Sequence, residues 1–354
     1  MEKNSHTREC IKRMAVGPKA SKNLSREEVS RAMSDILEGH VEPVMAAVFF
    51  IGLRLKRETQ EENEGILEGI GVHASTWEAP LPRVLDMADP YDGFKRMPHW
   101  SLFRAAVVGA MGLPVVLHGS TQIPPKNGIT TLDMIRYGVS SPELRISREA
   151  TQHSLLECGW TFCDLEGFCP PLERMRTLRD HMVKRTCLAT VEKLLLPVRG
   201  QESTVCISGY VHPGYGETVA KLLSRSGVNS GWVFCGPEGH PSLHGGKTSS
   251  IMGFRDDISA METLDVPGTG FTWPKDRQVI PRNILEAGLS ALQPREESEG
   301  LRGHLIHEAG VHAHLADGGR SLEEGIELAR TVIENGSALR GLQRGLSILG
   351  RSGE

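Results

Sequence analysis

The sequence predicts an α/β protein made of a small all-helical N-terminal unit and a large, mostly parallel β-sheet domain covered by helices. Apolar residues recur at helical spacing as far as residue 75. After residue 80, short apolar runs alternate with amphipathic stretches, which is typical of parallel strands whose crossover helices cover the sheet. The 354 residues are 39% hydrophobic and 24% charged, the balance of a folded globular chain. We expect a helical unit at 23–75, joined by part of 172–200, and an α/β domain at 80–345.

The chain before the helical unit is expected to be a basic, poorly ordered arm over residues 1–22. The first helix begins after Ser25, which forms an S-x-x-E capping box with Glu28. Gly39 is suited to end this helix, because glycine adopts the left-handed conformation common at helix C-termini.

Two further helices complete the predicted unit. Pro43 suits the first turn of the second helix, whose body at 44–53 is apolar on all sides. Such a helix has to be covered by other elements or by a second subunit. Thr59 and Glu62 form another capping box and begin the third helix.

The α/β domain is predicted from apolar runs and the amphipathic stretches between them. Strands are expected at 84–88, 114–117, 160–164, 204–210 and 232–235. Helices are expected at 101–111, 147–158, 172–185, 216–226 and 321–336. The chain has no Walker, G-x-G-x-x-G or G-x-S-x-G signature, so none of these motifs indicates a P-loop, dinucleotide or serine-hydrolase site.

Charge and cysteine content narrow the class of protein. The chain has 40 basic and 44 acidic residues and a net charge of −4, so nucleic-acid binding would need a local basic patch. Seven cysteines without a C-x-x-C pair indicate neither a disulfide framework nor a zinc knuckle. The first fourteen residues lack an apolar core, and the apolar run at 44–53 is too short to span a bilayer. We expect a cytoplasmic protein with no membrane partner.

Three segments resemble the anthranilate phosphoribosyltransferase family (glycosyltransferase family 3). They are the helical segment at 23–70, VVGAMGLPVVLHG at 107–119 followed by Lys126 and Gly128, and SLEEGIELARTVIENGSALRGL at 321–342. The resemblance implies the catalytic-domain fold of nucleoside phosphorylases and phosphoribosyltransferases. It also implies that phosphoribosyl pyrophosphate is held by the α/β domain and that a homodimer forms through the helical unit. In the altered loops the chain is more similar to a divergent branch that includes nucleic-acid-binding, enzymatically silent relatives.

The expected pyrophosphate loop differs from the family pattern. Where the family has a glycine-rich loop, residues 88–93 read ADPYDG, with one glycine and with Pro90, which has no N–H to donate. Ser101 keeps a hydroxyl that could bind phosphate, whereas Leu102 has replaced one. The alternative is that this loop is only a structured turn.

The expected magnesium loop is also altered. The family has an Asp-Glu pair after the strand at 232–235, but here GPEGHPSLHGGK offers Glu238 as its one carboxylate. Magnesium is therefore expected only if phosphoribosyl pyrophosphate binds, and no other cofactor is indicated. Lys247 and the neighbouring histidines could contact phosphate directly. A solvated glycine-rich loop is the alternative.

Several positions retain the family's ligand-binding side chains. His118 and Gly119 stand in its His-Gly pair, and Lys126 and Gly128 keep its Lys-x-Gly. Arg179 matches the arginine that binds the acceptor's carboxylate, a role suited to a planar guanidinium. Its alternative is an ordinary surface arginine.

A basic stretch and a histidine cluster remain open to two interpretations each. Residues 172–185 could form a phosphate- or nucleic-acid-binding stripe or a solvated basic face. The stripe would consist of Arg174, Arg176, Lys184 and Arg185. His304 and Glu308 share a helix face at a spacing that suits metal ligands, but packing is the favoured role and no metal site is predicted.

The sequence thus supports two functions and identifies no catalytic residue. The first is a divergent phosphoribosyltransferase that transfers a pentosyl group to a nitrogen acceptor. The alternative is a non-catalytic nucleic-acid-binding homodimer of the same fold, and a dimeric scaffold or small-molecule sensor is the third option.

Overall fold

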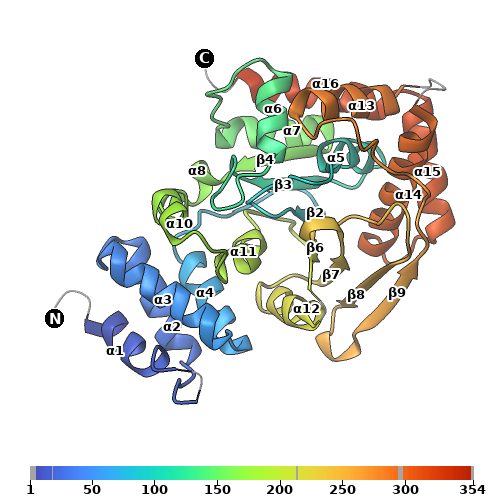
Figure 1. Cartoon of the computed structure of the whole chain (residues 1–354). Coiled ribbons are helices and arrows are strands. Elements are labelled where there is room, and N and C mark those ends of the chain that lie inside the picture. The colour runs from blue at the N-terminus through green and yellow to red at the C-terminus, as the bar shows by residue number, and fades with distance from the viewer. Residues whose placement is uncertain (1–4, 18, 213, 294–297, 352–354) are drawn as a thin grey trace.

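The computed structural model describes residues 5–17, 19–212, 214–293 and 298–351, which form a helical unit beside a larger α/β unit (Figure 1). The helical unit contains α1 (Ser5–Met14), α2 (Arg26–Leu37), α3 (Pro43–Lys56) and α4 (Gln60–Gly71). The predicted capping boxes of α2 and α4 are confirmed, with both reciprocal hydrogen bonds present in each. Gly65 lets α2 and α4 pack closely, because a Cβ there would lie 2.5 Å from the carbonyl oxygen of Arg26.

The prediction of a poorly ordered arm is wrong for Ser5–Met14, which form α1. Residues 1–4 and 18 of that arm lie outside the described residues. Thr7, Cys10 and Met14 are buried, and Met14 packs against Gly52 of α3. Arg13 also pairs with Glu28 of α2. Arg8 and Lys12 are exposed and Arg13 is half-buried against Glu28, so the basic charge of this segment did not indicate disorder.

The sheet has seven strands in the order β4-β3-β2-β6-β7-β8-β9. They are β2 (Arg83–Ala88), β3 (Val115–Gly119), β4 (Trp160–Asp164), β6 (Ser203–Tyr210), β7 (Ser230–Cys235), β8 (Ser249–Arg255) and β9 (Glu262–Val266). The five predicted strands pair in parallel, whereas β8 and β9 add an antiparallel edge that was not predicted. A separate pair joins β1 (Trp77–Glu78) to β5 (Val198–Arg199).

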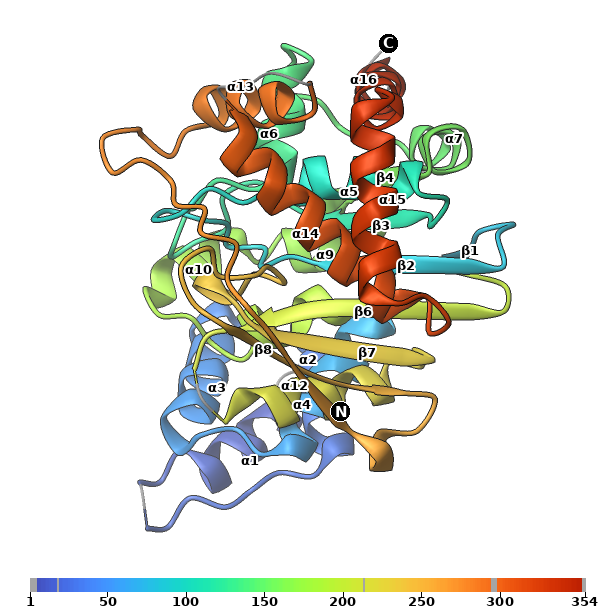
Figure 2. The ribbon, with the colours of Figure 1, turned by 90° about the vertical axis from the view of Figure 1, so that its right-hand side faces the viewer.

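Helices cover both faces of the sheet (Figure 2). They are α5 (Ser101–Ala110), α6 (Thr131–Gly138), α7 (Arg148–Cys158), α12 (Tyr215–Arg225), α13 (Pro281–Ala291), α14 (Glu299–Ala316), α15 (Leu322–Glu334) and α16 (Ser337–Gly350). One apolar cluster joins α5, α14, α15 and α16 to the sheet. A second cluster continues from α12 and the other face of the sheet into the helical unit, so the two units share a core.

The single helix predicted at 172–185 is wrong. Residues 172–185 contain only the end of α9 (Pro170–Glu173) and α10 (Arg176–Met182). They are flanked by α8 (Leu165–Phe168), α11 (Leu188–Val191) and a 3-10 turn at Glu192–Leu194. Val183 has φ of 60°, which ends α10. α10 contacts α3 and α11 contacts α4, between the two units (Figure 1). The domain boundaries stay a prediction.

Among the described residues, no helix is both long enough and apolar enough to cross a membrane.

Candidate functional site

A cleft of about 630 Å³ lies between the helical unit and the loops that follow β2, β6 and β7. Ligands of α/β proteins commonly bind at this edge, beyond the carboxyl ends of the parallel strands. The lining includes six lysine and arginine side chains and two carboxylates, which gives a formal net charge of +4 with histidine neutral. The charged residues are Arg54, Arg96, Lys126, Lys184, Arg185, Lys193, Asp92 and Glu238.

Lys126, which the family resemblance marks as a ligand-binding residue, lines the cleft, but it already has partners in the chain. Its ammonium is 2.9 Å from Oε2 of Glu238 and 3.7 Å from Oδ1 of Asp92. Gly128 supports this arrangement through its backbone, because a Cβ there would lie 2.4 Å from the backbone nitrogen of Phe94. Gly128 therefore holds the Lys126 loop against the loop after β2.

Glu238 occupies a natural anion site. Its carboxylate accepts backbone N–H groups from Lys95, Arg96 and Met97, at 3.3, 2.8 and 3.1 Å. Burial raises the pKa of Glu238, but the charge of Lys126 and these N–H groups outweigh burial and leave the pKa below its ordinary value. Successive N–H groups beside a cation form a typical anion nest, and here the chain supplies the anion itself.

His118 and Gly119 lie on β3, below the cleft. His118 contacts Asp86 through Nε2 at 3.0 Å and the hydroxyl of Tyr91 through Nδ1 at 2.6 Å. The ring of Tyr91 lies over Gly119, where a Cβ would be 3.2 Å from Cδ1 of the tyrosine. The space remaining beside His118 is about 10 Å³, so Tyr91 encloses this histidine.

Arg179 is a buried residue of α10 and not a surface arginine. Its guanidinium forms a two-pronged ion pair with Glu192, with Nη2 donating to Oε1 at 3.0 Å and Nη1 donating to Oε2. Glu192 was missed by the sequence analysis, since a glutamate thirteen residues away in a broken helical stretch has no recognisable spacing. The pair connects α10 to the 3-10 turn.

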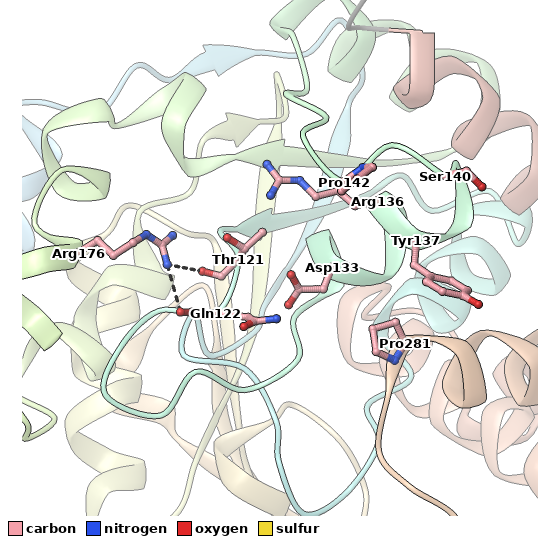
Figure 3. A pocket seen from close by; sticks show the side chains of 9 residues that line it. All are labelled: Thr121, Gln122, Asp133, Arg136, Tyr137, Ser140, Pro142, Arg176 and Pro281. Carbon is pink, nitrogen blue, oxygen red and sulfur yellow. Dashed lines mark hydrogen bonds between the residues drawn. The ribbon is translucent and has the colours of Figure 1, made fainter.

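The predicted basic stripe is divided between two surfaces. Lys184 and Arg185 line the cleft, and Nε of Arg185 is 3.1 Å from Oδ2 of Asp92. Arg176 instead lines a separate pocket of about 860 Å³, in which it donates to the carbonyls of Thr121 and Gln122 (Figure 3).

The remaining predicted phosphate contacts have different surroundings. Arg174 is exposed after α9, and Lys247 is exposed on the loop before β8. Ser101 begins α5 and is fully buried. Its hydroxyl donates to Oδ1 of Asp89 at 2.9 Å and accepts from Nη2 of Arg104 at 3.0 Å.

His304 and Glu308 have the packing role that the sequence favoured. Nε2 of His304 is 3.5 Å from Oε1 of Glu308, but Glu308 is also paired with Arg104 at 2.9 Å and accepts the backbone N–H of Leu243 at 2.8 Å. Glu308 thus ties α14 to α5 and to the loop after β7.

The fold, a helical unit beside a mostly parallel sheet, is that of solved anthranilate phosphoribosyltransferases. The anthranilate phosphoribosyltransferase of Thermus thermophilus matches with a TM-score of 0.75 and 22% identity, over 97% of this chain and 99% of that one. The Saccharomyces cerevisiae enzyme in complex with PRPP and Mg matches with a TM-score of 0.78 and 15% identity, over 98% and 99%.

Sequence comparison adds the family. The helical bundle domain of the glycosyl transferase family matches residues 8–70, and its a/b domain matches residues 98–339. The chain belongs to this family, which includes the anthranilate phosphoribosyltransferases. The Thermomicrobium roseum anthranilate phosphoribosyltransferase is 26% identical over 92% of this chain and 93% of its own. An uncharacterised Aquifex aeolicus protein is 25% identical over 86% and 91%, and the uncharacterised protein YbiB of Escherichia coli is 26% identical over 67% and 75%.

The cleft carboxylates do not suit the magnesium that the family resemblance implies. Asp92 and Glu238 are both paired with cations of this chain. Asp89, the buried carboxylate beneath them, lies beside the imidazole of His240, 3.4 Å away. Mg²⁺ prefers oxygen ligands and keeps several waters, so these groups do not form a typical magnesium site.

Proposed function

We propose that this protein is a non-catalytic member of its family that binds nucleic acid at the rim of the cleft. The observation that carries the proposal is the exposed rim itself, where Arg54, Arg96, Lys184 and Arg185 surround one opening. Cations grouped in this way neutralise successive phosphates of a nucleic-acid backbone.

Aromatic groups at the same opening favour a nucleic-acid strand. Tyr215 is 42% exposed, and its ring centroid lies 6.4 Å from that of His212. Both residues line the cleft. Unpaired bases stack on exposed aromatic rings that lie beside cations able to bind the phosphates of a nucleic-acid backbone. Single-stranded nucleic acid is therefore the expected ligand.

The cleft floor argues against the family's transfer reaction. Displacement of pyrophosphate needs an open anion cradle and groups that stabilise the leaving charge. Here Glu238 fills the cradle, Tyr91 encloses His118 and Glu192 neutralises Arg179. Three positions that would contact the reactants are thus occupied by partners from the chain.

A divergent phosphoribosyltransferase is the second candidate, supported by the size and cations of the cleft. A volume of about 630 Å³ is adequate for a phosphoribosyl ligand, since small-molecule sites typically measure about 300–1,000 Å³. Lys126 and Lys193 lie at its floor, and burial lowers the pKa of Lys193 to about 8. Such a transferase would have to displace Glu238 when its phosphorylated ligand binds.

Salt-dependent binding separates the two functions. Fluorescence anisotropy with a single-stranded DNA and an RNA oligonucleotide should show affinity that falls about 50-fold between about 50 and 200 mM salt, as expected for roughly four neutralised phosphates. Replacing both Lys184 and Arg185 by alanine should lower the logarithmic salt slope by about 1.4. Arg330→Ala, an exposed change on α15, should leave the slope unchanged.

Phosphoribosyl pyrophosphate provides the opposing test. The proposal expects no magnesium-dependent rise in the thermal unfolding midpoint with this ligand. A magnesium-dependent rise together with absent or salt-independent oligonucleotide binding would overturn nucleic-acid binding and favour the transferase.

A further inference from the structure

Three buried residues beneath the cleft bring metal-ligand atoms together. Asp89 follows β2, His99 precedes α5 and His240 follows β7, and their ligand atoms all lie within 4.8 Å of one another. The exposed fractions of the three are 6%, 2% and 2%. They come from three separate loops at the carboxyl edge of the sheet, so the fold and not local sequence assembles them.

The three side chains are of the kinds that transition metals take as ligands. Zinc and iron accept imidazole nitrogens together with carboxylate oxygens. A neutral imidazole has a lone pair available for a metal ion. The neighbouring cation, Arg104, is paired with Glu308 at 2.9 Å.

Among the described residues, the ring nitrogens of the two histidines have one side-chain hydrogen-bond partner, the hydroxyl of Ser101, which lies 3.2 Å from Nε2 of His240. Nδ1 of His240 is buried and makes no hydrogen bond with the described residues, and neither ring nitrogen of His99 makes one of normal geometry. The backbone of Thr130 is a polar neighbour of the His99 ring. Buried polar atoms are usually hydrogen-bonded, so the ring nitrogens of His99 and Nδ1 of His240 require an explanation.

Neighbouring groups orient the three side chains. Thr131 donates to Oδ2 of Asp89 at 3.2 Å, and Ser101 donates to Oδ1 at 2.9 Å, which places Oδ1 3.4 Å from Nε2 of His240. The ring of Phe94 stacks on His99 at 4.4 Å between centroids and lies 4.6 Å from His240. Such supporting contacts are what hold metal ligands in place in known sites.

We propose that Asp89, His99 and His240 bind one divalent transition-metal ion, for which Zn²⁺ is the representative. Ligand atoms around tetrahedral zinc lie about 3.3 Å apart, and Nε2 of His240 is 3.4 Å from Oδ1 of Asp89. Two nitrogen ligands and one oxygen favour zinc or iron over Mg²⁺. His99 and His240 also line a pocket of about 270 Å³, from which a water or small ligand reaches the fourth position. The site is independent of the proposed nucleic-acid binding.

Cobalt titration of the full-length protein tests the site. The chain is stripped with a chelator, dialysed and titrated with Co²⁺, and visible absorption then reports ligand number, with Zn²⁺ as competitor. We expect one Co²⁺ per chain with bands of a four- or five-coordinate ion. Asp89→Asn and His99→Gln should each abolish saturable binding, and Thr131→Val should weaken it by about 10- to 100-fold.

An exposed group of similar composition supplies the control. Asp35, Glu38 and His40 also lie close together, at the end of α2. His40→Ala should leave the cobalt stoichiometry and spectrum unchanged. Loss of binding in His40→Ala, retention in both Asp89→Asn and His99→Gln, or no stoichiometric binding by the unaltered protein would overturn the proposal. Circular dichroism shows whether a variant is folded, and Thr131→Val provides the test if either ligand variant is not.

Discussion

At the scale of single residues, the cleft differs from an open ligand site because the chain supplies its own counter-ions. Lys126 is paired with Glu238, Arg185 with Asp92 and Arg179 with Glu192. The family resemblance singled out Lys126 and Arg179 as ligand-binding residues, and that role stays a prediction. Their partners could not be predicted, because Glu192 and Glu238 meet these cations only after distant segments have packed together.

Glu238→Gln should open the anion nest to phosphate. Glutamine cannot supply the negative charge that the N–H groups of 95–97 and Lys126 surround, so an external anion becomes the better partner. We expect a lower thermal unfolding midpoint in chloride buffer and a larger rise with inorganic phosphate than in the unaltered protein. The control Glu217→Gln changes an exposed glutamate of α12. Equal phosphate responses in Glu238→Gln and the unaltered chain would contradict this account of the nest.

His312 should make the protein less stable in acid. Its ring contacts the carbonyls of Glu308 and Pro241, and burial with the charge of Arg104 lowers its pKa to about 3. Because the folded pKa is below the unfolded one, the unfolded chain binds the proton first, and stability falls as the pH drops below about 6.5. Between pH 7 and 5 this residue should remove about 2 kcal/mol from the free energy of unfolding.

Urea unfolding at the two pH values measures this effect. In His312→Gln the loss of stability between pH 7 and 5 should be smaller than in the unaltered chain by about 2 kcal/mol, although the variant is less stable at pH 7. An unchanged difference between the two pH values would show that His312 titrates normally.

At the scale of elements, capping boxes and apolar runs predicted the helices and strands whose formation depends on residues close in the sequence. The capping boxes at Ser25 and Thr59 fix helix starts within one turn, and buried parallel strands such as β2 are continuous apolar runs. β9 was missed because its residues ETLDV are mostly exposed, and it is a strand only through pairing with β8. α1 was missed since its apolar residues are few and gain burial only by packing against α2 and α3.

The contact between α2 and α4 should depend on Gly65. A methyl group there would lie 2.5 Å from the carbonyl of Arg26 and 2.8 Å from Cβ of Val29, so Gly65→Ala forces the helices apart. We expect a loss of about 1–3 kcal/mol in the free energy of unfolding, measured by denaturant titration. Gly71→Ala is the matched control, because its Cβ meets nothing within 4 Å and alanine favours a helix. If Gly65→Ala and Gly71→Ala changed the free energy of unfolding equally, the close contact between α2 and α4 would not be what requires glycine at position 65.

At the scale of the whole molecule, the net charge of −4 conceals a local cationic opening. The rim residues Arg54, Arg96, Lys184 and Arg185 come from the helical unit, the loop after β2 and the segment after α10. Composition could not reveal this grouping, since it arises where the two units meet. The overall fold was predictable from the three segments that resemble the family. The ion pairs inside the cleft were not, because they join residues from distant parts of the chain.

The helical unit should mediate a homodimer through α3. This helix exposes Val44 by 77%, Val48 by 42% and Leu55 by 80%, at positions that share one side of the helix. Apolar side chains exposed together on one helix are costly in water unless a second surface covers them. A symmetric pairing of α3 with its copy would cover them and would place the two cationic openings in one particle.

Light scattering coupled to gel filtration measures this association. The unaltered chain should have twice the mass of the 38.8 kDa monomer. Val48→Glu combined with Leu55→Glu should give the monomer mass, because two carboxylates from each copy would be buried without partners. Leu156→Glu, on the exposed face of α7, should remain dimeric. A monomeric unaltered chain, or a double variant that keeps the dimer mass, would exclude α3 as the interface. Loss of oligonucleotide affinity in the monomeric variant, with a smaller salt slope, would then show that the two openings act on one strand, since joined sites bind more tightly and neutralise more phosphates than one site alone.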